Sequence, residues 1–172
     1  MHTVAPDGLA EGLRDLLTRH ADVEVYRLRA LEESIEVQIE KGELAVVQAL
    51  KAGADEALML DPTGAVATCN ATNFFVVRRG EVLTSTGHYS LGGITRRMII
   101  ELCKTSNIPV SERPFSLTDV YGADEAFVTG TFGGITPVVE VDGRTIGAGE
   151  RGELTARLTD LYAEAISEAT VG

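Results

Sequence analysis

The order of apolar and polar residues along the chain predicts helices that alternate with short strands. Apolar residues recur every three to four positions in segments 7–20, 43–52, 95–105 and 150–169, which is the spacing of helices with one buried face. Strict alternation at 35–39 predicts a half-buried strand. Shorter apolar segments predict further strands at 22–28, 56–60, 66–68, 74–78, 81–84, 108–113, 125–129, 138–141 and 145–146, and a single helical turn at 117–121.

Turn residues separate these segments and predict how they connect. Gly53 has the residue type of a helix C-cap, and Asp61–Gly64 has the composition of a tight turn. Arg79–Gly80 and Asp142–Gly143 each join two predicted strands over two residues, as in hairpins. The middle of the chain is therefore predicted to be a meander of antiparallel strands. Polar pairs at the start of two strands, Asp55–Glu56 and Asp124–Glu125, are interpreted as ordinary polar flanks rather than as paired acids.

Composition indicates one domain, or one domain with an appendage, around an aliphatic core. The chain has 172 residues, 44% of them hydrophobic, with 5% aromatic residues and no Trp. A net charge of −11 argues against a nucleic acid or an anionic membrane as partner, since both require a basic patch. Cys69 and Cys103 are too few for a disulfide framework, and no membrane span or signal-peptide pattern is found, so we expect a cytoplasmic location. Three scattered histidines predict no metal site.

Two glycine- and threonine-rich loops carry the clearest chemical signal. One spans 91–96 (Leu-Gly-Gly-Ile-Thr-Arg) directly before a predicted helix, and the other spans 129–134 (Thr-Gly-Thr-Phe-Gly-Gly) directly after a predicted strand. Free N–H groups at a helix N-terminus, together with threonine hydroxyls, can bind a phosphate or carboxylate. For either loop alone, a tight turn that uses glycine for positive φ is the favoured interpretation, and only the two loops together point to an anion site. Arg96–Arg97 could assist an anion, although pairing on the surface is the simpler expectation.

Six motifs in register extend this signal over much of the chain, which resembles the class IV aminotransferase family, the pyridoxal-phosphate enzymes of fold type IV. The motifs occupy residues 52–61, 70–75, 93–96, 123–127, 129–131 and 136–138. The resemblance covers about residues 43–165 and implies an α/β fold, in which mostly antiparallel strands form a pseudo-barrel with helices outside. Residues 43–172 would form the large domain of such an enzyme, and residues 1–42 an unrecognised segment of helix and strands.

The resemblance also implies which positions would bind the cofactor, pyridoxal 5'-phosphate. Ile94, Thr95 and Thr131 match phosphate ligands, and Leu91 matches the residue that packs on the pyridine ring. Gly130, Thr131 and Phe132 border the position of the substrate carboxylate, and Asn73 matches a structural asparagine. The full set of cofactor-binding candidates is Thr68, Leu91, Gly93, Ile94, Thr95, Gly130 and Thr131, and the substrate-binding candidates are Thr131 and Phe132.

Three differences from the family pattern affect the functional interpretation. The lysine that bonds covalently to the cofactor would fall at about Ser34, and the chain has three lysines, Lys41, Lys51 and Lys104. Thr68 stands where the family has a glutamate beside the ring nitrogen, and a hydroxyl can hydrogen-bond that nitrogen without carrying a charge. The smaller N-terminal domain of the family has no counterpart in the first forty or so residues, as in a truncated relative.

Two functions follow from the resemblance and its exceptions. The first is a pyridoxal-phosphate-dependent aminotransferase for a branched-chain or related amino acid with 2-oxoglutarate as acceptor. The second is a catalytically inactive homologue that binds the cofactor or a phosphate, or serves as a dimer partner. In either case we expect a homodimer, with an amino acid or 2-oxo acid as the small-molecule partner.

Overall fold

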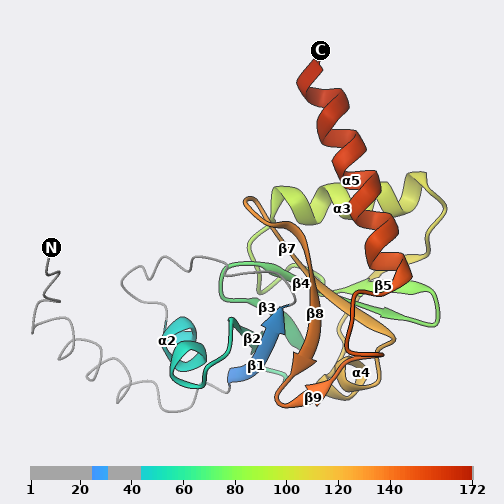
Figure 1. Cartoon of the computed structure of the whole chain (residues 1–172). Coiled ribbons are helices and arrows are strands. Elements are labelled where there is room, and N and C mark those ends of the chain that lie inside the picture. Colours follow the sequence, from blue (N-terminus) through green and yellow to red (C-terminus); the bar gives the residue numbers. More distant parts are fainter. Residues whose placement is uncertain (1–24, 31–43, 172) are drawn as a thin grey trace, which may run out of the picture.

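The computed structural model describes residues 25–30 and 44–171 (Figure 1). Two segments predicted from the sequence, 7–20 and 35–39, lie outside the described residues, as do Ser34 and Lys41. The described elements are β1 (Val25–Ala30), α2 (Leu44–Lys51), β2 (Glu56–Leu60), β3 (Val66–Cys69), β4 (Asn73–Arg78), β5 (Glu81–Thr84), α3 (Ile94–Thr105), β6 (Val110–Glu112), α4 (Leu117–Tyr121), β7 (Glu125–Gly130), β8 (Gly134–Val141), β9 (Arg144–Thr145) and α5 (Glu153–Val171).

All described strands belong to one nine-stranded sheet in the order β3-β2-β1-β8-β7-β4-β5-β6, with β9 paired to β8. The pairs are antiparallel except for β5 with β6, which are parallel. β3 and β4 lie far apart in this order, yet only residues 70–72 connect them, and the Cys69 N–H donates to the Thr72 carbonyl at 3.0 Å. The sheet must therefore curl until β3 and β4 meet, which produces the pseudo-barrel.

The inside of the curled sheet holds one of two large hydrophobic cores. Inward-facing residues alternate along each strand, as a period of two requires. Phe115 and Val120, around α4, close one end of this core. Its strand members include Leu58, Val66, Phe74, Val76, Leu83, Val128, Val138 and Val141, each no more than 2% exposed.

The outer face of the same strands packs against α3 and α5, which lie over one side of the sheet (Figure 1). Phe75 of β4 and Phe127 of β7 stack there with ring centroids 4.9 Å apart. The Glu125 carboxylate accepts the backbone N–H groups of Leu154 at 3.0 Å and Thr155 at 2.8 Å. A carboxylate on the free N–H groups of a helix is a stabilising cap, so β7 holds α5 at its first turn.

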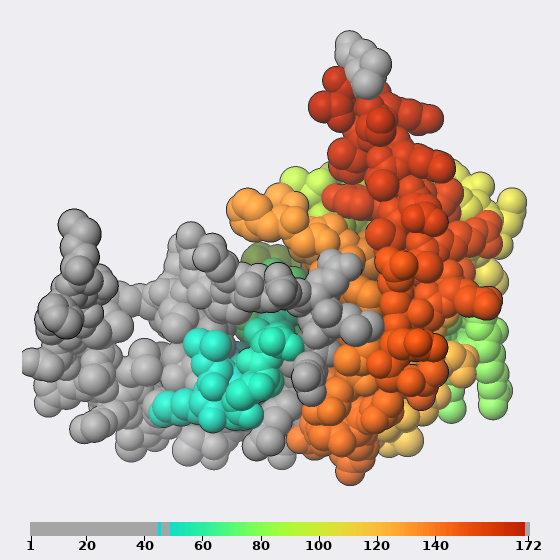
Figure 2. All heavy atoms as spheres, viewed as in Figure 1, coloured from blue at the N-terminus to red at the C-terminus, as the bar shows by residue number. Residues whose placement is uncertain are grey.

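The last turns of α5 extend past the sheet and α3 (Figures 1 and 2). Residues 166–170 are exposed, in agreement with this position. Within the described part of the chain, no helix is both long and apolar enough to cross a lipid bilayer.

A small third core lies under α2, where Ala45 and Ala49 pack on Ala54 and Ala57. The helix ends as its sequence predicts. Gly53 has φ +71°, and the Ala54 N–H donates to the Ala49 carbonyl at 2.9 Å, the bond pattern of a helix terminated by a left-handed residue.

The predicted fold class is confirmed: the molecule is α/β, with mostly antiparallel strands and outer helices. The hairpin turns at Arg79–Gly80 and Asp142–Gly143 are also confirmed, since all four residues have φ between 52° and 77°. The predicted boundaries differ from the structure mostly by one residue and, apart from β1, by more in three elements. β6 is shorter than 108–113, α5 begins at Glu153 rather than at 150, and β8 begins at Gly134 rather than at 138. β8 is longer because Gly134 and Ile135 pair with β7, a tertiary pairing that a glycine-rich segment does not indicate.

β1 lies between β2 and β8 and pairs with both in antiparallel register. Residues 25–28 of the strand predicted at 22–28 therefore belong to β1. The division into residues 1–42 and 43–172 stays a prediction.

Candidate functional site

The first glycine-rich loop ends where α3 begins, and the helix start there is open. Gly93 is the N-cap residue, with φ −60° and ψ 137°, and no side chain caps the first turn. The N–H groups of Ile94, Thr95 and Arg96 have no acceptor within the helix, because the first-turn donors of any α-helix lack one. The positive end of the helix dipole adds to these donors, so this terminus can attract an anion.

Asn73, the first residue of β4, holds this loop against the sheet. Its amide nitrogen donates to the Leu91 carbonyl at 3.1 Å and lies 3.5 Å from the Thr68 hydroxyl. A Cβ atom on Gly93 would overlap the Asn73 Oδ1, so only glycine fits beside this asparagine. Asn73 therefore brings Thr68, Leu91 and Gly93, three of the predicted cofactor-binding residues, into one neighbourhood.

Thr68, in β3, is half-buried, and its hydroxyl already has a fixed hydrogen-bond direction. It donates to the Thr72 carbonyl at 2.8 Å. Because that bond uses the hydroxyl's only proton, the oxygen can serve a ligand only as an acceptor.

The second glycine-rich loop forms the tip of the β7–β8 hairpin, which projects from the sheet near α3 (Figure 1). Gly130 pairs with Gly134 at its base, and Thr131, Phe132 and Gly133 are exposed, Phe132 completely so. Thr129, just before the tip, pairs in register with Asn73. The base of the hairpin is therefore next to the strand residue that holds the α3 loop.

Three apolar side chains around these two loops face outward. Leu91 is 89% exposed, Ile94 70% and Phe132 104%. By contrast, the Thr95 side chain is only 5% exposed. Large exposed apolar groups that cluster around polar donors are typical of a binding site or an interface.

Arg96 is buried, in contrast to the surface pairing expected from the sequence. The residue is 8% exposed, and its guanidinium donates to the Ser85 carbonyl at 2.7 Å and to the Glu112 carboxylate at 2.8 Å. It lies on the inner face of α3, so it fastens the β5–α3 connection to the end of β6 instead of facing solvent. The sequence expectation was wrong because Arg96 falls in the helix stripe that faces inward with Ile99 and Ile100.

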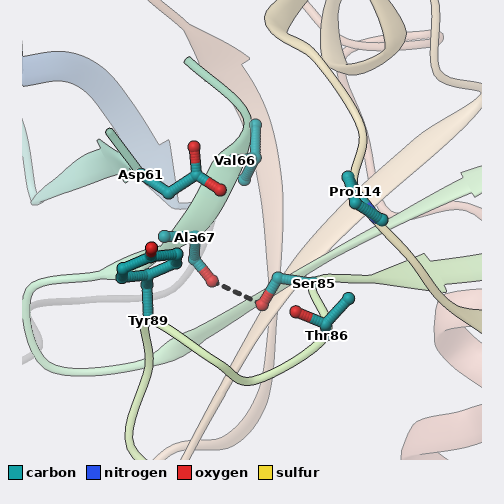
Figure 3. A pocket seen from close by; sticks show the side chains of 7 residues that line it. All are labelled: Asp61, Val66, Ala67, Ser85, Thr86, Tyr89 and Pro114. Atoms are coloured by element: carbon teal, nitrogen blue, oxygen red, sulfur yellow. Dashed lines mark hydrogen bonds between the residues drawn. The ribbon is translucent and has the colours of Figure 1, made fainter. Parts of the chain in front are cut away.

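A small hollow lies beside the start of the same connection (Figure 3). The predicted cofactor-binding residues do not line it, so it is separate from the candidate site. Across it, the Ser85 hydroxyl donates to the Ala67 carbonyl at 2.6 Å, which ties the end of β5 to β3. The hollow is lined by Asp61, Val66, Ala67, Ser85, Thr86, Tyr89 and Pro114.

Two residues next to the site, the buried Glu56 and the half-buried Thr72, were not identified from the sequence. Glu56 is fully buried and accepts the Ala71 N–H at 3.0 Å and the Thr72 hydroxyl at 2.5 Å. Burial raises the pKa of the Glu56 carboxyl above its ordinary value, while the hydrogen bond from Thr72 opposes the rise. The alternation of faces along a strand could have indicated that Glu56 is buried. Glu56 lies two residues before the core residue Leu58 and therefore shares its face of the strand.

Neither described lysine lies at this site. Lys51 is exposed in the last turn of α2, a helix that packs on β1 and β2. Lys104 pairs with Glu101 at 2.9 Å on the surface of α3. Ten residues separate Lys104 from Ile94, which is about 15 Å along a helix axis. Lys41 lies outside the described residues.

Comparison with known proteins identifies the class to which this fold and these loops belong. The profile of the amino-transferase class IV family matches residues 41–141. The chain belongs to this family.

The similar proteins are aminotransferases. The branched-chain-amino-acid aminotransferase of Pseudomonas aeruginosa is 43% identical over 127 residues, which cover 74% of this chain. The D-alanine aminotransferase of Listeria monocytogenes is 39% identical over 105 residues, or 60% of this chain. Among solved structures, a T.th. branched-chain amino acid aminotransferase complexed with N-(5'-phosphopyridoxyl)-L-glutamate superposes with a TM-score of 0.70 at 40% identity over 73% of this chain.

The chain is much shorter than these relatives. Its matched region spans 41% of the Pseudomonas protein, 36% of the Listeria protein and 42% of the T.th. protein. The fold of this region is thus that of fold type IV aminotransferases, while the relatives' activities belong to longer chains.

Proposed function

We propose that this chain binds pyridoxal 5'-phosphate between the α3 loop and the β7–β8 hairpin, as part of an aminotransferase for a branched-chain or related amino acid. The observation that carries the proposal is the uncapped N-terminus of α3. It is held by Asn73 beside a second glycine–threonine loop, in a chain 40% identical to a protein solved with a phosphopyridoxyl ligand.

Three features of the described residues fit a bound phosphate. The N–H groups at the start of α3 lack both a side-chain cap and an acceptor within the helix. The Thr131 side chain is exposed at the hairpin tip. The Thr129 hydroxyl is buried at the hairpin base with no hydrogen-bond partner among the described residues, which is unusual for a buried polar atom.

In this proposal each residue has a distinct role. Gly93 lets the anion approach the backbone, while Ile94, Thr95 and Thr131 donate to phosphate oxygens. Leu91 covers one face of the ring and excludes water from it. The Thr68 hydroxyl can only accept a hydrogen bond from the ring nitrogen, which favours the protonated form of that nitrogen. Thr68 supplies no formal charge. When bound, the cofactor would supply the electron sink that transamination requires.

The substrate would lie on the hairpin side of the cofactor. Gly130 and Thr131 border the position of its carboxylate, and Phe132 covers its side chain. We propose that the substrates are a branched-chain or related amino acid and, as acceptor, 2-oxoglutarate.

A cofactor titration tests the proposal directly. Purified protein is titrated with pyridoxal 5'-phosphate, followed by absorbance, and then reduced with borohydride for intact-mass measurement. A covalent adduct, mapped to a peptide, would identify which of the three lysines reaches the cofactor. Saturable binding without an adduct would instead support the second function, a cofactor-binding homologue without turnover. That alternative has a specific motive, because both described lysines lie away from the site. Absence of saturable binding would contradict cofactor binding in both functions and would leave only the dimer-partner form of the second.

We also propose that the chain forms a homodimer, supported by the exposed Leu91, Ile94 and Phe132. Sedimentation equilibrium at several concentrations would test this, and a monomer throughout would contradict it. A cytoplasmic location stays a prediction.

A further inference from the structure

The buried carboxylate of Glu56 clamps the turn between β3 and β4. Both of its oxygens accept hydrogen bonds from that turn, one from the Ala71 N–H and one from the Thr72 hydroxyl. A second clamp lies beside it, where the Ala57 N–H donates to the Asn70 side-chain oxygen at 2.6 Å. Since a buried carboxylate is stable only when its oxygens are hydrogen-bonded, this turn and β2 hold each other in place.

Thr72 contacts its surroundings through its hydroxyl, its carbonyl and its methyl, and the carbonyl also accepts the Cys69 N–H at 3.0 Å. Its hydroxyl donates to Glu56, and its carbonyl accepts from the Thr68 hydroxyl at 2.8 Å. Its methyl lies against Gly130, where an added Cβ would be 3.2 Å from the Thr72 Cγ2. The next residue in the chain is Asn73, which holds the Leu91 carbonyl. Thr72 thus touches both the β3 side and the hairpin side of the candidate site.

From these contacts we infer that Thr72, held by Glu56, is a positioning residue that sets the Thr68 hydroxyl and the Gly130 backbone for the ligand between them. This inference rests on the proposed cofactor site. Thr72 itself does not bind the cofactor. It acts through the carbonyl that fixes the direction of the Thr68 hydroxyl and through the methyl that supports the hairpin base.

Two substitutions separate the contacts of Thr72. Thr72→Val keeps a methyl toward Gly130 but removes the hydroxyl from Glu56. Thr72→Ser keeps the hydroxyl but removes the methyl. Thr159→Val is the matched control, since the Thr159 hydroxyl is also partly buried but bonds within α5, to the Thr155 carbonyl at 2.8 Å.

Affinities for three probes are measured by titration at a temperature where every variant is folded: pyridoxal 5'-phosphate, pyridoxal and inorganic phosphate. We expect Thr72→Val to lower the affinity for pyridoxal phosphate and for pyridoxal by about tenfold, which is the effect of one lost hydrogen bond. We expect Thr72→Ser to lower the affinity for pyridoxal 5'-phosphate and for inorganic phosphate by about threefold. The affinity for pyridoxal should stay unchanged, because the methyl supports only the hairpin side. The absorbance maximum of the bound cofactor should shift in Thr72→Val, and Thr159→Val should match the parent protein in every binding measurement.

Hydrogen exchange of the ligand-free protein makes the test independent of turnover. Peptides that cover residues 68–73 should exchange faster in Thr72→Val than in the parent, and peptides that cover residues 130–134 should exchange faster in Thr72→Ser. Peptides that cover β5 and α4 should exchange alike in all variants. If both Thr72 variants melt lower but bind all three probes like the parent, Thr72 is merely structural and the inference is overturned.

The inference and the proposed function can fail separately. If the parent protein binds neither pyridoxal phosphate nor inorganic phosphate, the proposed function fails. The coupling of Thr72 to the hairpin is then judged by hydrogen exchange, and unchanged exchange at residues 130–134 overturns it as well.

Discussion

The two edges of the candidate site are built differently. The helix loop (residues 91–95) is tied down from several sides: Asn73 holds its carbonyl, Gly93 fits against that asparagine, and the buried Arg96 anchors the segment before it. The hairpin tip (residues 131–133) is exposed, and among the described residues its main supports lie at its base, where Gly130 meets Thr72 and Gly134 meets Tyr162 of α5. One edge is therefore set by the fold in advance, whereas the other gains its contacts from a ligand or a partner.

This difference has a functional consequence. Prearranged donors at the helix loop let an anion bind with little further loss of conformational entropy. An exposed tip with Thr131 and Phe132 can adapt to what the anion carries. Substitutions at the helix loop should therefore change stability and affinity together, whereas substitutions at the hairpin tip should change affinity alone.

The largest effect is expected from Gly93→Ala. The added methyl would overlap the Asn73 Oδ1, so the asparagine must move and its bond to the Leu91 carbonyl is lost. Forced overpacking of this kind costs about 1–3 kcal/mol of unfolding free energy, and affinity for pyridoxal phosphate should fall by more than about tenfold. Urea unfolding and a cofactor titration measure the two effects.

Gly92→Ala is the matched control for that change. A Cβ on Gly92 would meet none of the described residues within 4 Å. The control should keep the parent's stability to within about 0.5 kcal/mol, as surface substitutions usually do. Equal losses in the two variants would contradict the view that the helix loop is fixed through Asn73.

Gly134→Ala should have the next largest effect, at the base of the hairpin. Gly134 has φ +59°, and an added Cβ would be 3.2 Å from a Tyr162 ring carbon. The left-handed backbone alone costs about 1–2 kcal/mol for a residue with a side chain. The contact with Tyr162 should additionally displace the hairpin, so that affinity falls along with the melting temperature.

Gly143→Ala separates backbone strain from that displacement. Gly143 has φ +74°, and in the part of the chain that the structure describes no atom lies within 4 Å of an added Cβ. The Gly143→Ala substitution should lower the melting temperature through backbone strain but leave the affinity for the cofactor unchanged. A loss of affinity in Gly143→Ala as large as in Gly134→Ala would show that the hairpin base has no special role.

Glu56→Gln tests the buried clamp through pH. Because burial raises the pKa of Glu56, the folded protein binds the Glu56 proton more tightly than the unfolded chain does. The stability that comes from this protonation is fully present below the ordinary pKa of 4.5 and is lost as pH rises through the folded-state value. Glutamine cannot titrate, so this part of the pH slope should disappear from urea unfolding measured across that range.

Near neutral pH the same substitution should cost about 1 kcal/mol, because glutamine keeps one of the two acceptors. An unchanged pH slope in Glu56→Gln would mean that another group produces it. In that case the clamp would not depend on the charge of Glu56.

The smallest effect on stability is expected from Phe132→Ala at the hairpin tip. The side chain is fully exposed, so the unfolding free energy should change by less than about 0.5 kcal/mol. Affinity for 4-methylvaleric acid, a ligand of the T.th. relative, should nevertheless fall by about three- to tenfold if Phe132 covers an apolar substrate chain. Leu50→Ala, another exposed apolar residue, is the control and should leave this affinity unchanged.

Much of the fold was predictable because the relevant signals are local. Short apolar segments predicted β2 and β5 to the residue, and the position of turn glycines predicted the end of α2 and two hairpin turns. The site loops were also predicted, since a glycine–threonine segment at a helix start has a local meaning. The buried roles of Arg96 and Glu56 were missed, because charged residues are interpreted as exposed unless their partners, here 16 residues away in each case, are known.

The sequence by itself determined the family, the order of elements and the two loops, because periodicity, turn residues and motifs act over short stretches of chain. The tertiary structure alone decided that Asn73 lies next to both loops. Residues 70–72 join two strands that are distant in the sheet order, so the sheet curls, and Asn73 comes to lie beside both Thr129 and Gly93. It also decided that Glu56 and Arg96 are buried, since their hydrogen-bond partners exist only once the strands and α3 have packed.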